Sequence, residues 1–286
     1  MPTRQERIAG GLWGLLVADA VGVPYEFHAP HELPPRELLE MTPPSGFQRA
    51  HARIAPGTWS DEGAQALALF DSLLTCGKLN LDDFAQRLLD WYQKGVWAVD
   101  HDVFDVGIQT RQAFQKLLDG VPAPQAGPGH EQANGNGSLM RVLPLALWHT
   151  GTDTALVHDT HQQSLVTHGH LRAQVCCALY CLWARRTLDE VPNPWQNAVA
   201  TLRAIYGPHS PAAHELDTHN RPDAPPIGKG RGYVVDCLHS ARLALEEVTY
   251  EEVVKSAIAL GNDTDTTACV AGGIAGIREG VAAIPA

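Results

Sequence analysis

The chain has 286 residues, enough for one large domain with a full hydrophobic core. Apolar residues make up 44% and charged residues 19%, a globular balance that excludes a disordered chain. The formal net charge is −11, and no run of Lys and Arg is longer than two residues. This distribution argues against a nucleic-acid groove or an anionic membrane surface as the main partner.

The chain shows no targeting signal and no membrane anchor by its sequence. The opening stretch "MPTRQERIAGG" has neither an apolar core nor a cleavage pattern. We expect no apolar stretch to reach the roughly 20 residues of a membrane span. The cysteines of "CCALYC" (176–181) lie near His168 and His170, but their spacing fits no usual zinc site, so buried reduced thiols are favoured. We therefore expect a soluble, cytoplasmic protein with no membrane partner.

Helical periodicity dominates the chain. Apolar residues recur every three or four positions in six segments: 7–22, 64–76, 81–95, 171–186, 234–248 and 250–261. Strand patterns are almost absent. Pro and Gly gather at 29–57, 120–137 and 207–232, which predicts long loops of the kind that are usually functional or mobile. We see no repeat and no break in composition, and we predict one all-α domain over residues 1–286.

Two acidic loop-to-helix junctions occur in the N-terminal part. Glu26 follows the helix 7–22 in "ADAVGVPYEF". In "PGTWSDEGAQALALF" a helix is predicted to begin at Ser60, a good N-cap, with Asp61 and Glu62 in its first turn. Favourable interaction with the helix dipole, worth about 0.3–1 kcal/mol per acid, is the alternative explanation for Asp61 and Glu62.

A third acidic junction lies in "GNDTDTTACVAGGIAGIREG" (261–280). Two Asp and three Thr fill positions 263–267, more than one helix cap requires. The Asp-x-Asp-Thr pattern offers three hard oxygen ligands of the type that Mg²⁺ and Mn²⁺ prefer. The small residues that follow let this helix approach its neighbours closely. Five carboxylates at three such junctions predict a site for more than one divalent ion.

Several segments resemble one family in their order and spacing. They are "GLLVADAVGVPYEF", "GTWSDEGAQALALF", "FDVGIQTRQAF", "GNGSLMRVLPLAL", "SLVTHGH", "GYVVDCLHSARLAL" and "GNDTDTTACVAGGIAGIREG". The chain is similar to the ADP-ribosylglycohydrolase family, the family of the dinitrogenase-reductase-activating glycohydrolase, from residue 7 to about residue 280. The resemblance implies a single compact orthogonal bundle of helices around two Mg²⁺ or Mn²⁺ ions. It also implies cleavage of the bond at the anomeric carbon of ADP-ribose.

The resemblance assigns roles to individual residues. The metal ligands it implies are Glu26, Ser60, Asp61, Glu62, Asp263, Asp265 and Thr266. Asp105 would lie beside the substrate ribose, although without the resemblance it looks like an acid at a helix N-terminus. Gly107 would let a helix N-terminus approach the diphosphate, and a plain turn glycine is the alternative.

The resemblance also implies a substrate pocket. The residues that would contact ADP-ribose are Asn136, Gly137, Ser138, His168, Gly232 and Tyr233, and those that would fix the turn of the substrate loop are Met140, Arg141 and Pro144. Each has a plainer alternative. Asn-Gly loops are commonly just flexible, a lone His is usually structural, and Tyr233 could be a core aromatic.

The chain departs from its family at two adjacent positions of one motif. The family reads Ser/Thr-Asp-Asp-Thr where this chain has Ser60-Asp61-Glu62-Gly63. We expect Glu62 to meet its metal in a distorted or water-mediated way, with Gly63 giving the longer acid room to move. Because Mn²⁺ tolerates distortion better than Mg²⁺, we expect higher activity with Mn²⁺.

The implied function is a divalent-metal-dependent hydrolase that releases ADP-ribose from a modified protein, nucleic acid or small molecule. A water activated with help from Glu26, Asp61 or Glu62 would attack the anomeric carbon, and Asp105 would orient the sugar. Two alternatives stay open: an ADP-ribose-binding or structural protein on the same fold, and a metal phosphohydrolase acting on nucleotides. The group attached to ADP-ribose and the oligomeric state are also open.

Overall fold

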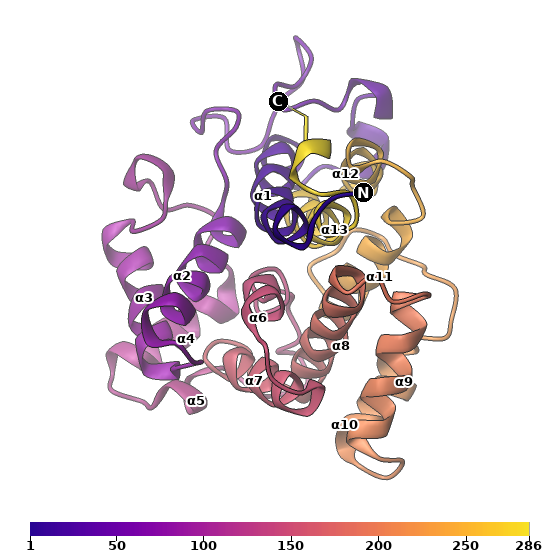
Figure 1. Cartoon of the computed structure of the whole chain (residues 1–286). Helices are drawn as coiled ribbons and strands as arrows, with labels where there is room; N and C mark the ends of the chain where they lie inside the picture. The colour runs from indigo at the N-terminus through magenta and orange to yellow at the C-terminus, as the bar shows by residue number, and fades with distance from the viewer. Residues whose placement is uncertain (286) are drawn as a thin grey trace. The chain divides into compact units, whose positions relative to one another are not determined.

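The computed structural model describes residues 1–285 (Figure 1). It contains thirteen α-helices, and none of residues 1–285 lies in a β-strand, so the all-α prediction is confirmed. The six predicted segments, and the helix predicted to follow residue 263, form α1 (Arg4–Gly22), α2 (Asp61–Cys76), α3 (Leu81–Lys94), α8 (Leu171–Leu188), α11 (Val234–Ala244), α12 (Tyr250–Ile258) and α13 (Thr264–Glu279).

The remaining helices lie between the predicted ones. They are α4 (Ile108–Leu118), α5 (Ala123–Ala126), α6 (Leu143–Trp148), α7 (Asp153–Leu165), α9 (Pro194–Tyr206) and α10 (Pro211–His214). The predicted loops carry only short elements, such as the 3₁₀ turns Pro30–Glu32 and Arg36–Leu38 and the π-helical turn Glu215–Asn220. Pro30, at the first position of its 3₁₀ turn, fixes φ there without removing a needed hydrogen-bond donor.

The chain forms two compact units. One consists of Met1–Gly63 with the chain from Pro226 onward, and the other of Ala64–Pro225. The single domain expected for residues 1–286 therefore stays a prediction, and each unit is described by itself.

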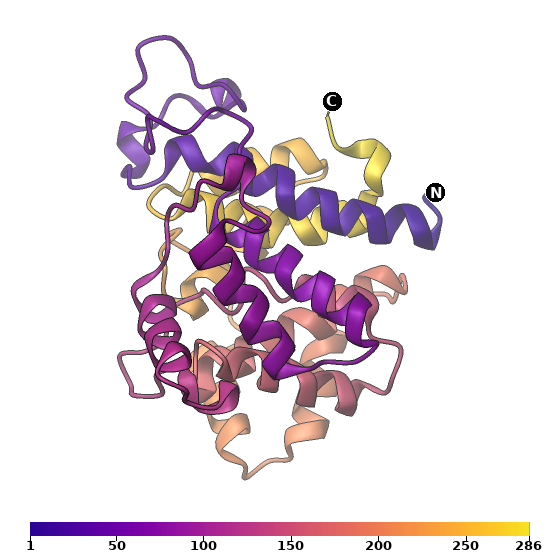
Figure 2. The same ribbon diagram turned by 90° about the vertical axis from the view of Figure 1, so that its left-hand side faces the viewer.

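The first unit is built on α1 and α13, which lie side by side (Figures 1 and 2). A Cβ added at Gly10 would lie 2.1 Å from the carbonyl oxygen of Gly276, and one at Gly14 would lie 2.5 Å from that of Gly272. The hydroxyl of Tyr250 in α12 donates to the carbonyl of Gly14 at 2.7 Å. Glycine on both helices lets the two backbones touch, which confirms the close approach predicted for the small-residue run.

One expectation about α1 is wrong. An 18-residue window of the 22-residue helical stretch Arg4–Tyr25 has mean hydropathy 1.4, so by length and composition this stretch could cross a membrane. However, 67% of that window is buried inside the protein, where α1 packs on α13. A helix enclosed by its own unit needs apolar residues on most of its surface, and this gives it the composition of a membrane span.

The second unit is arranged around α8, which packs against α6, α7 and α9. Nearly every side chain of α8 is buried, as expected for a helix that is apolar all round. The six cysteines form no disulfide, and five of them are buried. Burial raises the pKa of the Cys177 thiol to about 11. Cys177 is therefore protonated at neutral pH, as the prediction of buried thiols requires.

Candidate functional site

Seven predicted metal ligands lie in the first unit, and all but Asp263 are buried. Two groups of three carboxylates occur in this unit, and within each group one ligand oxygen per residue lies within 4.8 Å of the other two. One group is Glu26, Asp263 and Asp265, and the other is Glu62 and Asp265 with Asp19, which is not a predicted ligand. Asp265 belongs to both groups.

The start of α13 does not behave as a simple helix cap. Asp263 occupies the N-cap position, but its side chain makes no capping hydrogen bond to the helix. Thr264 Oγ1 instead donates to the carbonyl of Gly22 at 2.8 Å, and the N–H of Thr266 donates to Asp265 Oδ1 at 2.8 Å. The capping explanation for this acidic turn therefore fails at Asp263, the residue best placed to cap.

Backbone pairing brings Glu26 beside α13. The N–H of Phe27 donates to the carbonyl of Asn262 at 2.6 Å, and the N–H of Asn262 donates to the carbonyl of His28 at 2.6 Å. Both Phe27 and Asn262 have positive φ, at 62° and 63°. Residues other than glycine rarely adopt the left-handed conformation, and here the two hydrogen bonds hold Phe27 and Asn262 in it. The same hydrogen bonds fix Glu26, which precedes Phe27, next to Asp263, which follows Asn262.

His51 is a site residue that the sequence patterns missed. Its Nε2 lies 2.7 Å from Glu26 Oε2, and both side chains are largely buried. Burial, and then the charge of Arg53, lower the pKa of His51, so the ring is neutral and donates its Nε2 hydrogen to the carboxylate. His51 lies in the Pro/Gly-rich segment 29–57, where no periodicity marks a functional side chain.

Glu62 reaches into the acidic cluster rather than away from it. Its Oε1 accepts a hydrogen bond from Thr266 Oγ1 at 2.5 Å, and its Oε2 is in hydrogen-bond contact with Ser60 Oγ. Gly63, by contrast, does not provide the room expected for Glu62. A Cβ at Gly63 would lie 2.9 Å from both Leu16 Cδ2 and Trp59 Cβ, so tight packing explains the glycine.

Asp19 is the second residue that sequence analysis missed. It lies in α1, is fully buried, and accepts hydrogen bonds from the N–H and hydroxyl of Ser60 and from the N–H of Gly63. Asp19 therefore caps α2, the role expected for Ser60. A lone acid inside the apolar run "GLLVADAVG" was the signal that could have identified it.

The donor set fits divalent cations. Buried carboxylates at this separation repel one another, and burying such charges is costly unless a positive charge or a proton neutralises them. The site offers carboxylate and hydroxyl oxygens, the ligands that suit Mg²⁺ and Mn²⁺. The thiol of Cys269 lies close by: burial, and then the charges of Asp19 and Glu62, hold its pKa well above the ordinary value.

The loop before α11 adjoins this cluster. A Cβ at Gly232 would lie 3.1 Å from Asp263 Oδ2, and the N–H of Asp263 donates to the carbonyl of Gly230 at 2.8 Å. Asp236 holds the loop by accepting from the N–H of Arg231 at 2.8 Å. Tyr233 is the N-cap residue of α11 and is 40% exposed, so its reading as a core aromatic is wrong.

Asp105 and Gly107 lie in the second unit. Asp105 has a φ of 51° and precedes α4, whose first turn contains no acid, so the alternative reading of Asp105 as a helix acid is wrong. Gly107 is the exposed N-cap of α4, and a Cβ there would meet only Thr110 Oγ1, at 3.7 Å. Packing does not require this glycine, whereas close approach of a ligand would.

The predicted substrate loop packs on His168. A Cβ at Gly137 would lie 2.7 Å from His168 Cε1, so this glycine is needed to fit the ring. His168 Nδ1 contacts Thr167 Oγ1 at 2.8 Å, and burial lowers the pKa of His168 to about 3. The Ser138 hydroxyl is fully buried and accepts from Ser164 Oγ at 2.9 Å, whereas Asn136 is 9% exposed.

Arg141 fixes this loop from inside, as expected. It is fully buried and donates to Gln65 Oε1 at 2.8 Å and to the carbonyl of Gln163 at 3.2 Å. Its guanidinium also lies over the ring of Phe84, 5.2 Å from the centroid. These contacts tie the loop to α2 and α7.

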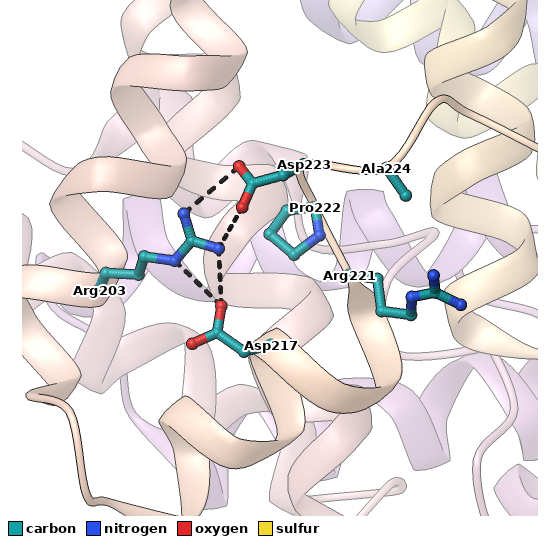
Figure 3. A pocket seen from close by; sticks show the side chains of 6 residues that line it. All are labelled: Arg203, Asp217, Arg221, Pro222, Asp223 and Ala224. Carbon is teal, nitrogen blue, oxygen red and sulfur yellow. Dashed lines mark hydrogen bonds and ion pairs between the residues drawn. The ribbon is translucent and has the colours of Figure 1, made fainter.

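A surface hollow of about 320 Å³ lies elsewhere in the second unit (Figure 3). Its lining includes Arg203, whose guanidinium is paired with Asp217 and Asp223 (Figure 3). These two carboxylates raise the pKa of Arg203 above its usual range. No residue predicted from the sequence to act in the site lines this hollow, and its charges neutralise one another.

Known proteins resemble this chain over almost its whole length. A sequence model of the ADP-ribosylglycohydrolase family matches residues 1–286. The chain is 30% identical to the ADP-ribosylarginine hydrolase Tri1 of Pseudomonas putida, over 98% of this chain and 72% of the relative. It is 26% identical to the ADP-ribosyl-[dinitrogen reductase] glycohydrolase of Rhodospirillum rubrum, over 99% of this chain and 89% of the relative. A solved structure described as an ADP-ribosylglycohydrolase-related protein complex superposes with a TM-score of 0.77 at 29% identity, over 99% of this chain and 90% of that one.

Proposed function

Because the chain belongs to the ADP-ribosylglycohydrolase family, we propose that it is a divalent-metal-dependent hydrolase that releases ADP-ribose from a modified substrate. The observation that carries the proposal is the pair of buried carboxylate groups that share Asp265. A protein that served only as a scaffold would gain nothing from keeping these mutually repelling acids together.

The metals would be held by the seven predicted ligands, with Asp265 shared between the two carboxylate groups. Bound Mg²⁺ or Mn²⁺ would supply Lewis-acid polarisation and a reactive water at neutral pH. His51 holds Oε2 of Glu26, which keeps this carboxylate turned toward Asp263. Glu26 and Asp61 are the proposed acceptors of the proton that the attacking water loses, and Asp105 would orient the ribose.

The bond that breaks joins the anomeric carbon to the departing group. Its cleavage passes through an oxocarbenium-like transition state, which nearby carboxylates stabilise electrostatically. The substrate contacts proposed from the second unit are Gly107, Asn136, Gly137, Ser138 and His168. Because His168 is uncharged at neutral pH, it would contact ADP-ribose as a hydrogen-bonding group rather than as a cation.

We propose an arginine-linked ADP-ribosyl protein as the first substrate to test, because the relative from Pseudomonas putida is named an ADP-ribosylarginine hydrolase. Other proteins, small molecules and nucleic acid that carry ADP-ribose remain candidates. We also propose a cytoplasmic location, which the six cysteines without a disulfide support.

The test is a panel of conjugates in which ADP-ribose is attached to arginine, serine, an acidic residue, nucleic acid or an O-acetyl group. Each conjugate is assayed with Mg²⁺, with Mn²⁺ and with a chelator, and released ADP-ribose is measured. Metal-dependent release from one member supports the proposal. Binding of ADP-ribose without turnover would favour a binding protein on the same fold, and release of phosphate from nucleotides would favour a phosphohydrolase.

A further inference from the structure

Asp19 holds the N-terminal turn of α2 through both of its carboxylate oxygens. Oδ1 accepts from the N–H and the hydroxyl of Ser60, at 3.0 and 2.7 Å. Oδ2 accepts from the N–H of Ser60 at 3.2 Å and from the N–H of Gly63 at 2.8 Å. The N–H of Ser60 is shared between the two oxygens, so three donor groups converge on this carboxylate. This suits a carboxylate that positions other groups better than one that binds a cation itself.

The hydroxyl of Ser60 is the critical contact. It has a single hydrogen, and two carboxylates, Asp19 and Glu62, lie within hydrogen-bond distance of its oxygen. A hydroxyl that binds a cation uses a lone pair, so its hydrogen must point away from the ion, toward an acceptor. Two backbone N–H groups fix Asp19 in place, and it is therefore the acceptor that does not move.

We propose that Asp19 is a positioning residue for the metal site. It orients the Ser60 hydroxyl so that its lone pairs face the cations, and it anchors the turn that carries Asp61 and Glu62. The inference rests on the proposed function, because it takes Ser60 as a metal ligand. Partners that orient metal ligands in this way commonly change metal affinity by about 10–100-fold when they are removed.

A helix cap alone would leave a different signature. Asn80 supplies a matched control, because its side chain caps α3 by accepting from the N–H of Asp83 at 3.3 Å. Asn80→Ala should lower the melting temperature and leave Mn²⁺ affinity unchanged. Asp19→Asn should lower both, since an amide in this place cannot accept all of the hydrogen bonds that Asp19 accepts.

The deciding experiment is a double-mutant cycle of Asp19→Asn and Ser60→Ala, with Mn²⁺ affinity measured by calorimetry on the full chain. Asp19→Asn alone should weaken Mn²⁺ binding by about 10–100-fold. In the Ser60→Ala background, where the hydroxyl is absent, the further loss should be well under that factor. Equal losses in both backgrounds would mean that Asp19 acts only on the fold, and would overturn the inference.

Two further measurements keep the result interpretable. If Asp19→Asn does not fold, the same cycle is run with Asp19→Glu, which keeps the charge and displaces its oxygens by one methylene; it must show the same coupling. ADP-ribose release is measured in parallel on the unmodified chain. If the chain hydrolyses a conjugate but the effects of the two mutations on Mn²⁺ affinity simply add, only the inference about Asp19 is overturned. If the two mutations are coupled but no conjugate is hydrolysed, the role of Asp19 stands and the proposed activity is overturned.

Discussion

The hydroxyl of Thr266 donates a hydrogen bond to Glu62 Oε1 at 2.5 Å, across 204 positions of the chain. This contact joins the first turn of α2 to the first turn of α13, the two segments that carry most of the candidate metal ligands. Glu62, one of the two residues at which this chain departs from its family, is thus part of the acidic cluster.

Glu62→Asp should narrow the ratio of Mn²⁺-supported to Mg²⁺-supported activity. We expect the unmodified chain to be more active with Mn²⁺, because Mg²⁺ demands near-ideal octahedral geometry and Glu62 displaces the carboxylate from its position in the family. Initial rates of ADP-ribose release with each metal at saturation give the ratio. An unchanged ratio would place Glu62 outside the metal shell, with a role confined to holding Ser60 and Thr266.

Gly63→Thr should destabilise the protein instead of repairing the family sequence. The Cβ of the new threonine alone would lie 2.9 Å from atoms of Leu16 and Trp59, which is too close for normal packing. Overpacking of this kind costs about 1–3 kcal/mol. Gly107→Ala is the matched control, since φ there is −60° and the nearest atom is 3.7 Å away. Denaturant unfolding should show a loss only for Gly63→Thr, and equal stabilities would contradict the packing argument.

Asp263→Asn and Asp265→Asn should each lower activity by orders of magnitude while the chain still folds. Each change removes a negative charge from the cluster but keeps the shape of the side chain, so the melting temperature of the metal-free protein should stay level or rise. The exposed acid Asp82, in the first turn of α3, provides the control Asp82→Asn. Full turnover in both cluster variants would contradict a role of this acidic turn in the reaction.

The protein should bind two divalent ions, about 3.5–4 Å apart, when it is saturated with Mn²⁺. Metal analysis gives the stoichiometry, and magnetic coupling between the two Mn²⁺ ions reports their separation. Because Asp265 belongs to both carboxylate groups and Asp263 to one, Asp265→Asn should weaken both ions and Asp263→Asn mainly one. Finding no bound metal would contradict the prediction, and a single ion would be the outcome if Glu62 has cost the site its second cation.

Stability should fall as the pH drops below about 6.5, the ordinary pKa of histidine. Burial lowers the pKa of His168 to about 3 and that of His161 to about 4. Below a pH of about 6.5, the unfolded chain therefore takes up a proton at each of these histidines, and the folded chain does not. The free energy of unfolding falls from that pH down to the pKa of each histidine in the folded protein. Each histidine contributes a slope of about 1.4 kcal/mol per pH unit.

Urea unfolding between pH 7.5 and pH 5 measures this slope. His168→Gln should flatten it by one histidine's share, whatever its effect on stability at neutral pH. A slope that His168→Gln leaves unchanged would mean that His168 is protonated in the folded protein.

The helices that carry the site could be predicted from the sequence because their causes are local. Periodic apolar residues define α1, α2 and α13, and left-handed Gly95 ends α3 where the pattern stops. The acids of the three junctions were visible for the same reason. Asp61, Glu62, Asp263 and Asp265 stand at helix starts, and Glu26 follows the end of α1 and its short 3₁₀ turn. Short helices such as α6 and α10, enclosed by Pro and Gly, had too few residues to show a period.

Asp19 and His51 show what only the tertiary structure decided. The lone acid in "GLLVADAVG" marks Asp19 as unusual, but the sequence does not identify its partners, because Ser60 and Gly63 are 41 and 44 positions away. His51 finds Glu26 only because the backbone of the segment 29–57 folds back on the turn before it. Residues that are far apart in the sequence become hydrogen-bond partners only when the backbone folds and brings them close in space. Residue type and local spacing do not show which distant residues will meet.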